Sequence, residues 1–368
     1  MDRWWDKCAT SGVEGKLFYS RVMRGLLVGL ALACGLLDET GLQRDAGDAA
    51  AVRVEGAVAG AHDPSMARDG GTYYVFATGH APGAPPGSAE LPVRCSEDLR
   101  VWRMCGSVFD AVPEWIKQAS PGTRDLWAPD VSFTHGEYRL YYAYSLFGKR
   151  TSGIALATNK TLDAKAAGYG WVDKGLVIAS TNADDFNAID PAYVEDDKGG
   201  GWLAFGSFWS GIKMRAVDAR TGLLSTTDTK LYSLARREGG AEGSAVEAPY
   251  VVAHGGYYYL FVSFGICCKG AKSTYRIMVG RAKKVTGPYE DEAGRKMMDG
   301  GGTEVLVGNS AWAGPGGESV MRDKDGTDLL VFHAYDAVTG RSQLQISRIG
   351  WVDGWPRAVL STEKTSAP

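Results

Sequence analysis

The sequence lacks the motifs that mark several large classes of enzyme and binding protein. Its 368 residues contain no P-loop, dinucleotide-binding fingerprint or G-x-S-x-G nucleophile motif in a suitable context. The six cysteines form neither a CxxC pair nor a Cys/His spacing that predicts zinc. No long basic run is present, and 40 basic against 43 acidic residues give a formal net charge of −3. We therefore expect no nucleic-acid partner.

What the chain does contain favours a large all-β domain. Hydrophobic residues make up 45% and aromatic residues 11% of the sequence, and there are 49 glycines. Aromatic residues are enriched in strands and glycines in turns. A chain of this length can bury a large core. The composition is typical of a soluble globular protein, and we expect a monomer.

The first 50 residues differ from the rest of the chain. Basic residues are frequent before position 25, and Gly25–Leu37 is then an apolar run of 13 residues. A spanning helix needs about 20 apolar residues, so a basic flank and a shorter run are typical of a signal peptide. We expect residues 1–50 to be a leader (signal peptide or signal anchor plus spacer) and 51–368 to be the folded domain. The protein is then secreted or extracellular, and Ala33-Cys34, which resembles a lipoprotein signal, leaves cell-surface anchoring open.

Two pairs of cysteines lie in the expected domain. Cys95 and Cys105 flank a short segment and could form a disulfide if that segment is a hairpin. Cys267 and Cys268 are adjacent, and we do not expect them to bond to each other, because adjacent cysteines cannot easily do so without strain.

Five acidic residues recur along the domain at intervals of 57 to 71 residues. Each opens a strand-like segment, which is followed by a Gly- or Asp-rich turn and an aromatic strand. The five acids are Asp63, Asp130, Asp190, Glu247 and Glu318. One carboxylate per unit at the same structural point predicts that the carboxylates converge. Like charges repel at short distance, so their convergence indicates a chemical purpose.

The repeated unit has the pattern of antiparallel hairpins. In the fourth unit, for example, the strand that begins at Glu247 turns at His254–Gly256 and continues as Tyr257–Phe264. Units of about 60 residues with roughly four strands each are typical of propeller blades. We therefore predict an all-β, five-bladed β-propeller whose innermost strands line a central channel. A β-sandwich is the alternative, but it leaves the five-fold spacing of the acids unexplained.

Eight short segments resemble a known family. In chain order they are HDPS, LWAPD, NAIDP, GSFWSGIK, EAPY, SFGICCKG, STYRIMVGR and GPY, spread over about residues 58 to 350. Together they resemble glycoside hydrolase family 43, and specifically its α-1,5-L-arabinanases. The resemblance implies a five-bladed propeller, hydrolysis with inversion, the pectin polysaccharide arabinan as substrate, and a metal ion in the channel.

The resemblance also implies a catalytic role for three of the acids. Inverting glycoside hydrolysis needs one carboxylate to activate water and one carboxylic acid to protonate the leaving oxygen. The family places its general base in HDP, which is Asp63 here, and its general acid in EAPY, which is Glu247. A third carboxylate, in IDP, corresponds to Asp190 and is expected to orient the acid and raise its pKa.

Four residues are predicted to bind substrate. Trp127 lies in LWAPD, where the family has a tryptophan near its sugar subsites, and flat rings suit sugar C–H faces. Asp130 beside it is expected to be either substrate-binding or structural. Asn187 and Ser207 are expected to hydrogen-bond sugar hydroxyls. For Phe147 and Trp209, packing in the core is at least as well supported as sugar binding.

The last two candidates belong to the fifth unit. The family more often has His-Asn where Gly317-Glu318 stand, so we expect Glu318 to be structural. His333 matches a position at which the family has a histidine that binds a hydrated, Ca²⁺-like ion. Calcium prefers six to eight oxygen ligands, so water would supply most of them. A lone histidine is more often a buried, hydrogen-bonded core residue.

The sequence therefore predicts a hydrolase of α-1,5-linked arabinan that cuts internally. An exo-acting α-L-arabinofuranosidase or a β-xylosidase of the same family remains open, because loop shape decides where the chain is cut. A carbohydrate-binding propeller without catalysis is the alternative from another class, and the presence of all three expected carboxylates argues against it.

Overall fold

The computed structural model describes residues 48–239 and 242–364 of the chain. The expected signal peptide, with Cys34, lies outside these residues. Within the described ranges, no helix is long and apolar enough to cross a membrane. The first described strand, β1 (Ala50–Val52), begins one residue before the predicted domain boundary.

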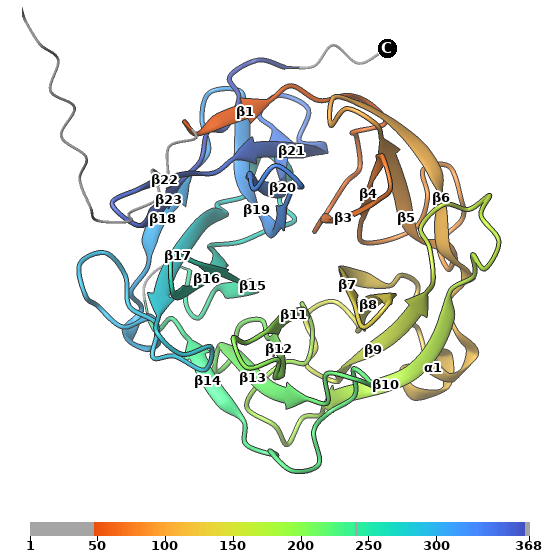
Figure 1. The fold of residues 1–368 in the computed structure, drawn as a ribbon, viewed down its shortest axis with the longest axis horizontal. Helices are drawn as coiled ribbons and strands as arrows, with labels where there is room; N and C mark the ends of the chain where they lie inside the picture. Colours follow the sequence, from red (N-terminus) through yellow and green to blue (C-terminus); the bar gives the residue numbers. More distant parts are fainter. Residues whose placement is uncertain (1–47, 240–241, 365–368) are drawn as a thin grey trace, which may run out of the picture. The chain divides into compact units, whose positions relative to one another are not determined.

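The described residues form a five-bladed β-propeller, as predicted, with four-stranded antiparallel sheets around a common axis (Figure 1). Blade 1 contains β3 (Ser65–Asp69), β4 (Thr72–Phe76), β5 (Ser88–Ser96) and β6 (Val101–Ala111). Blade 2 contains β7 (Trp127–Thr134), β8 (Glu137–Tyr144), β9 (Ser152–Asn159) and β10 (Val172–Ser180). Blade 3 contains β11 (Ala192–Glu195), β12 (Gly201–Phe205), β13 (Ile212–Val217) and β14 (Tyr232–Ala235).

Blade 4 contains β15 (Val246–His254), β16 (Tyr257–Phe264), β17 (Arg276–Ala282) and β18 (Thr303–Leu306). Blade 5 contains β19 (Trp312–Arg322), β20 (Asp328–Asp336), β21 (Ser342–Arg348) and β1. The smaller elements are β2 (Glu55–Gly56), which runs parallel to β6, the hairpin β22 (Gly350–Val352) and β23 (Trp355–Arg357), the helix α1 (Glu114–Ala119) and the 3-10 turns η1 (Gly270–Lys272) and η2 (Met297–Asp299).

The tight turns between the two inner strands follow from the local sequence. His135 and Gly136, between β7 and β8, both have positive φ angles, 50° and 77°. A two-residue hairpin loop of this kind matches the twist of the flanking strands, and glycine adopts it without a steric penalty. The sequence therefore fixes where each inner hairpin turns.

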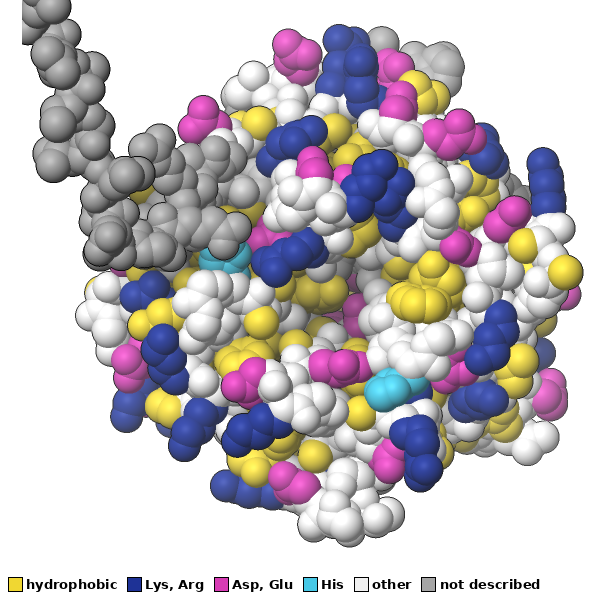
Figure 2. Space-filling view, in the orientation of Figure 1, with side chains coloured by type: hydrophobic (Ala, Val, Ile, Leu, Met, Phe, Trp, Pro, Cys, Tyr) yellow, Lys and Arg dark blue, Asp and Glu magenta, His cyan; other side chains and the backbone are white. Residues whose placement is uncertain are grey.

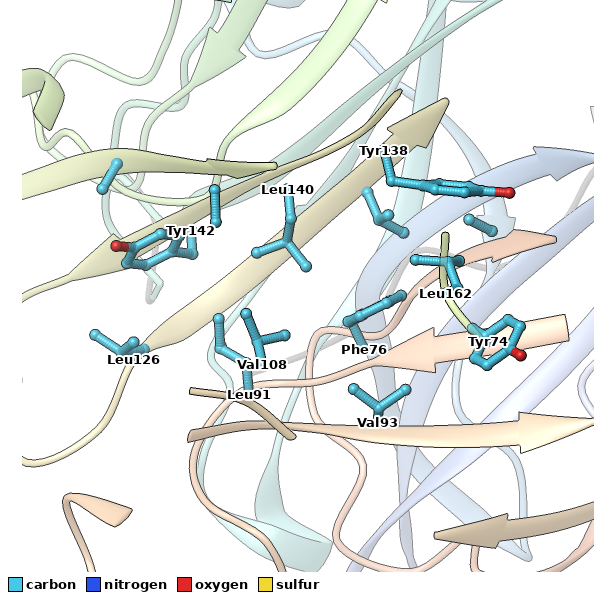
Figure 3. Close-up of a cluster of buried hydrophobic side chains, with 14 of the residues drawn as sticks. Tyr74, Phe76, Leu91, Val93, Val108, Leu126, Tyr138, Leu140, Tyr142 and Leu162 are labelled. Atoms are coloured by element: carbon cyan, nitrogen blue, oxygen red, sulfur yellow. The ribbon is translucent and has the colours of Figure 1, made fainter. Parts of the chain in front are cut away.

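Neighbouring blades are held together by apolar side chains between their sheets. Figure 3 shows the cluster between blades 1 and 2, where Phe76 and Leu91 lie opposite Leu140 and Tyr142. All four side chains are at most 1% exposed. Complete burial of such a side chain stabilises the fold by about 1.5–3 kcal/mol. Both faces of a blade are covered in this way, which explains why inner strands such as β9 and β20 are buried along their whole length.

The ring is closed by pairing the two ends of the described chain. β1 pairs with β21 in antiparallel register, from Ala50 opposite Arg348 to Val52 opposite Ile346. The other three strands of blade 5 come from the C-terminal part of the sequence. Closure therefore depends on three residues at the start of the domain.

We predict that deletion of residues 1–53 destabilises the propeller, whereas deletion of residues 1–47 does not. Only the longer deletion removes β1 and exposes the edge of β21. At a net value of about 1 kcal/mol per backbone hydrogen bond, we expect the loss of about 2–3 kcal/mol in the free energy of unfolding. Urea unfolding followed by tryptophan fluorescence measures it. Equal midpoints for the two truncated proteins would show that β1 is not needed for closure.

Candidate active site

Each blade has a residue with a left-handed backbone in its innermost strand or just before it. These residues are Asp63 (φ 47°), Ala128 (φ 42°), Asp190 (φ 55°), Ala248 (φ 52°) and Gly317 (φ 60°). In blades 2, 4 and 5 the same point is a bulge in the pairing of the two inner strands. A left-handed non-glycine residue costs of order 1–3 kcal/mol and is common at functional sites. Five equivalent points around one axis therefore mark the candidate site.

The five acids do not occupy one structural position, contrary to the sequence-based expectation. Asp63 and Asp190 are themselves the left-handed residues. Glu247 precedes the left-handed residue of its blade by one position, Glu318 follows it by one and Asp130 follows it by two. Because successive side chains of a strand point in different directions, these offsets send the acids to different levels of the channel.

Two cavities lie on either side of the left-handed residues. The larger, of about 970 Å³, is lined at the strand starts by His62, Asp63, Trp127, Asp190 and Glu247. The smaller, of about 30 Å³, is lined deeper in the channel by residues that include Asp63, Ser65, Asp130, Asp190 and Glu318. Figure 2 shows one face of the ring, which is hollowed near its centre, with acidic side chains inside the hollow. The three predicted catalytic acids thus share one large cavity.

Asp63 is held as a carboxylate. Its Oδ2 accepts hydrogen bonds from the Thr78 hydroxyl (2.6 Å) and from Nδ1 of His62 (2.9 Å). Burial alone would raise the pKa of Asp63, but the charge and hydrogen bond of His62, with smaller contributions from His333 and Thr78, hold that pKa well below its usual range. Asp63 is therefore ionised and can accept a proton.

Glu247 is held as a carboxylic acid. It is buried, and its two oxygens accept hydrogen bonds from Ser207 (2.6 Å to Oε2) and from the Tyr275 hydroxyl (to Oε1). Burial raises the pKa of Glu247, and the nearby charge of Asp63 adds to this, against the opposing effect of the two hydrogen bonds. A carboxyl group with a raised pKa keeps its proton at a pH at which Asp63 is ionised.

Asp190 lies between these two groups in chain order and contacts the strand of Glu247. The backbone N–H of Ala248, the residue after Glu247, donates to Oδ2 of Asp190 (3.0 Å). Burial raises the pKa of Asp190 well above its usual value, and the charges of Glu247 and Asp63 raise it further. Asp190 therefore both fixes the backbone at Glu247 and disfavours loss of the proton that the two acids hold.

Asp130 and Glu318 lie at the deeper level. Both are buried and line the smaller cavity, and neither borders the larger one. Asp130 accepts hydrogen bonds from the Tyr193 backbone N–H (2.6 Å) and the Ser65 hydroxyl (3.4 Å). Burial raises the pKa of Asp130 to about 7 and that of Glu318 to about 8. Of the two roles expected for Asp130, this placement favours the structural one, because its strand position turns it away from the large cavity.

Aromatic side chains also border the large cavity. Trp127 lines it as predicted. Phe147 and Trp209 line it as well and are 80% and 36% exposed. They are therefore not core residues. Of the two roles that the sequence left open for them, core packing is ruled out. Flat exposed rings beside buried acids are a surface on which sugar rings can stack.

Two predicted polar contacts lie in the wall of the same cavity. Asn187 is 2% exposed, and its side-chain oxygen accepts a hydrogen bond from the Ser152 hydroxyl (2.7 Å). Ser207 donates its hydroxyl to Glu247, as described above. The structure therefore gives Ser207 a contact with the predicted acid, while sugar binding by either residue stays a prediction.

The cysteines fulfil one expectation and contradict another. Cys95 and Cys105 form a disulfide between neighbouring strands β5 and β6, as proposed. Cys267 and Cys268 also form a disulfide, which we did not expect. The backbone at Cys268 is left-handed, with a φ of 63°, which differs from the extended or helical backbone of most residues. This pair forms part of the wall of the large cavity.

A cation could be held beside Asp63. His333 is completely buried; its Nδ1 accepts the backbone N–H of Asp63 (3.2 Å), and its Nε2 has no partner among the described residues. Burial lowers the pKa of His333 well below its usual value, so the ring is neutral, which is the form that binds metals. Ligand atoms of His62, Asp63 and His333 all lie within 4.8 Å of one another. Binding of a metal through Nε2 requires the tautomer of His333 that carries its proton on Nδ1, and the contact with the backbone N–H of Asp63 would then be released. With that change, His333 and Asp63 fit a cation.

Sequence reasoning missed four residues around the predicted acids, of which three contact an acid directly and Tyr335 contacts His62. They are His62, Thr78, Tyr275 and Tyr335. His62 and Tyr275 lie within the segments HDPS and STYRIMVGR, so the motifs contained them, but their spacing gave no reason to assign roles. Thr78 and Tyr335 come from the ends of β4 and β20, and only the folded ring brings them to the cavity.

This arrangement can transfer protons at two points of one cavity. An ionised carboxylate and a protonated one, each with an identified cause for its pKa, are the pair that acid–base catalysis requires. Exposed aromatic rings beside them indicate a ligand with apolar faces and polar edges, such as a saccharide.

Comparison with known proteins agrees with this chemistry. The model of the family "Glycosyl hydrolases family 43" matches residues 58–356. The extracellular endo-α-(1→5)-L-arabinanase 1 of Bacillus subtilis (strain 168) is 42% identical over 297 residues, which cover 80% of this chain and 86% of that protein. The extracellular exo-α-(1→5)-L-arabinofuranosidase ArbA of Cellvibrio japonicus (strain Ueda107) is 42% identical over 306 residues, which cover 80% and 85%.

A solved structure shows the same likeness in three dimensions. The GH43 endo-arabinanase from Bacillus licheniformis superposes with a TM-score of 0.75 at 44% identity, covering 83% of this chain and 99% of that one. With its propeller, its three acids and these relatives, the chain belongs to glycosyl hydrolases family 43.

Proposed function

We propose that this protein hydrolyses α-1,5-linked L-arabinan with inversion and cuts the polysaccharide internally. The observation that carries the proposal is the pair Asp63 and Glu247, which border one cavity and have pKa values shifted in opposite directions. The names of the relatives, which refer to α-(1→5)-L-arabinan in both endo and exo forms, supply the sugar and the linkage.

In the proposed reaction, Glu247 donates its proton to the glycosidic oxygen as the bond from that oxygen to the anomeric carbon breaks. Asp63 takes a proton from a water molecule, whose oxygen forms the new bond to the anomeric carbon from the opposite face. The product sugar therefore has the inverted configuration. Asp190 keeps the proton on Glu247 and holds the backbone of Ala248, so that the acid points into the cavity.

Sugar units on either side of the cut would stack on the exposed rings. Trp127, Phe147 and Trp209 border the same cavity as the acids. Ring stacking does not depend on a free chain end, which suits internal cutting. Trp127, Asn187 and Ser207 remain our candidates for substrate contacts. Asp130 is no longer among them, because it faces the smaller cavity.

Exo action is the second candidate, because the exo-acting relative is as similar as the endo-acting one. A time course of products from debranched arabinan separates the two. Internal cutting gives a ladder of oligosaccharides at early times, whereas cutting from an end gives one product from the start. Wheat arabinoxylan serves as a control, since release of xylose from it would favour a β-xylosidase. Binding of arabinan without any product would overturn the enzymatic proposal.

We also propose that a hydrated divalent cation such as Ca²⁺ binds through His333. When bound, the cation would offset the negative charge of the surrounding carboxylates and order water molecules near them. The support is the buried Nε2 of His333, which has no partner among the described residues, and the carboxylate oxygen Oδ1 of Asp63, which lies 3.7 Å from Nδ1 of the same ring.

Export of the protein is proposed on the names of two relatives, both of which are called extracellular, and on the N-terminal pattern of basic and apolar residues. Anchoring at the cell surface through a lipid on Cys34 is a separate proposal. Mass spectrometry of the secreted protein would identify the first residue and any lipid on it.

We predict that Glu247→Gln lowers kcat on arabinan by about 10²–10⁴, the usual contribution of a general acid. The loss should be much smaller on an aryl arabino-oligosaccharide with a good leaving group, which needs no protonation. Steady-state kinetics on both substrates measure this. The control is Glu304→Gln, which changes an exposed carboxylate of β18 and should leave both rates unaltered. Equal losses on both substrates would contradict the assignment of Glu247 as the acid.

We predict that Asp190→Asn moves the alkaline limb of the kcat profile to lower pH. Glu247 works in its protonated form. Burial raises the pKa of Asp190, and the charge of Glu247 raises it further, so the two carboxyls disfavour each other's ionisation and an ionised Asp190 favours the protonated form of Glu247. Without this charge the pKa of Glu247 falls, so its proton is lost at a lower pH. The measurement is kcat from pH 4 to 10 for both proteins. An alkaline limb that stays in place while kcat falls would limit Asp190 to a steric role.

We predict that chelation with EDTA lowers the unfolding temperature and that added Ca²⁺ restores it. A ligand at 100 times its Kd stabilises the folded state by about 2.7 kcal/mol. His333→Ala should abolish the response to Ca²⁺. His80→Gln should retain it, which tests the other group of potential ligands, His80, Glu90 and Asp125. A Ca²⁺ response that survives in His333→Ala and disappears in His80→Gln would place the ion at the other group.

A further inference from the structure

His62 lies directly before Asp63 and contacts it through a defined nitrogen. Its Nδ1 is 2.9 Å from Oδ2 of Asp63, and its Nε2 is 2.6 Å from the hydroxyl oxygen of Tyr335. The ring also stacks on His333, with centroids 3.8 Å apart. Both nitrogens of His62 are therefore engaged by protein groups, although the side chain borders the large cavity.

Burial lowers the pKa of His62, but the charge and hydrogen bond of Asp63 raise it above its usual value, and a charged ring carries a proton on both nitrogens. For a neutral ring, the contacts of Tyr335 determine where the single proton lies. The backbone N–H of Cys268 donates to the Tyr335 hydroxyl oxygen (3.0 Å). The hydroxyl has one proton of its own, and its neighbour on the other side is Nε2 of His62. If the hydroxyl donates to Nε2, that nitrogen is an acceptor and the ring proton is on Nδ1. His62 then donates to Asp63, as the 2.9 Å contact requires.

This chain of hydrogen bonds distinguishes the two oxygens of Asp63. Oδ2 accepts from both His62 and Thr78. Oδ1 has no hydrogen bond among the described residues, and the neutral ring of His333 lies near it, with Nδ1 at 3.7 Å. Rotation of the carboxyl group would break both bonds to Oδ2. Oδ1 is therefore the atom available to take a proton from water.

We propose that His62, with its ring orientation set by Tyr335, is a positioning residue for Asp63 and fixes which carboxylate oxygen acts as the base. The proposal rests on the function proposed above. It assigns no contact with substrate to His62, because both ring nitrogens are engaged. The outer end of the chain of bonds is the backbone of Cys268, which the disulfide to Cys267 ties to the cavity wall.

A matched pair of variants tests the proposal. The side-chain nitrogen of asparagine is placed close to the position of Nδ1 of histidine, and that of glutamine close to the position of Nε2. His62→Asn can therefore still donate to Asp63, whereas His62→Gln cannot. We expect His62→Gln to lower kcat about 10–100-fold, part of the usual contribution of a general base, with KM changed less than about threefold. His62→Asn should keep at least about ten times the kcat of His62→Gln.

Tyr335→Phe is the second, independent variant. It removes the donor to Nε2 without touching His62 or Asp63, so the ring proton is no longer confined to Nδ1. We expect a smaller loss of kcat than in His62→Gln, again with little change in KM. Unfolding temperatures and near-UV circular dichroism of all three variants establish that each is folded.

Azide rescue distinguishes positioning of the base from a merely structural role. The substrate is the 4-nitrophenyl glycoside of α-1,5-arabinotriose. Azide needs no deprotonation: its nitrogen forms a bond to the anomeric carbon as the nitrophenolate leaves with the bonding electron pair. Sodium azide should therefore raise the rate of His62→Gln several-fold and give the inverted glycosyl azide, and it should leave the rate of the unaltered enzyme unchanged.

The outcomes separate this proposal from the one on which it rests. If the unaltered enzyme releases no product from arabinan, the proposed function fails. If it does, three results would each overturn the role of His62: unchanged kcat in His62→Gln, equal kcat in His62→Gln and His62→Asn, or a folded His62→Gln whose loss azide does not restore.

Discussion

The left-handed residue near the start of each innermost strand is the constraint on which the site depends. It turns the chain so that the residue before it faces the large cavity and the residues after it face the closed channel. Each non-glycine case costs of order 1–3 kcal/mol, and the packed blades on both sides hold it in place. Asp63, Asp190 and Glu247 border the large cavity because of where they stand relative to this residue, and Asp130 is excluded from it for the same reason.

The same geometry separates the acid from the base. Asp63 and Glu247 are both within the channel, so burial raises the pKa of each. The groups around each carboxyl decide whether its pKa is finally lowered or raised. Asp63 receives hydrogen bonds from His62 and Thr78 and lies beside two histidines. The hydrogen-bond partners of Glu247 are neutral hydroxyls, and the charge of Asp63 raises its pKa against a smaller opposing effect of His62. One cavity therefore holds one ionised and one protonated group.

The sequence predicts the blades and the acids well because both follow a repeat. The signals are alternating apolar residues, glycine turns and a carboxylate every 57 to 71 residues, and all three can be recognised without knowledge of the tertiary structure. The positions of the acids relative to the left-handed residue are not such a signal, so Asp130 was expected at the same level as Asp63. Tyr335 was missed because it is 273 residues from His62 and meets it only in the closed ring, whereas Thr78 is brought to Asp63 by the pairing of β3 with β4. The roles of Phe147 and Trp209 could not be assigned, because the local sequence does not show whether an aromatic ring is exposed or buried.

The departure from the family pattern at Gly317-Glu318 is linked to the position of His333. A Cβ atom on residue 317 would lie 2.5 Å from Oδ1 of Asp63 and 2.8 Å from the ring of His333, and the φ of 60° is itself unfavourable for other residues. The histidine that the family more often has here therefore needs a different arrangement of both neighbours. In this chain the ring of His333 occupies the space beside Gly317. It accepts a hydrogen bond from the backbone N–H of Asp63 and stacks on the ring of His62. The ring of His333 thus contacts the backbone of the proposed base, Asp63, and a larger residue at position 317 would displace this ring.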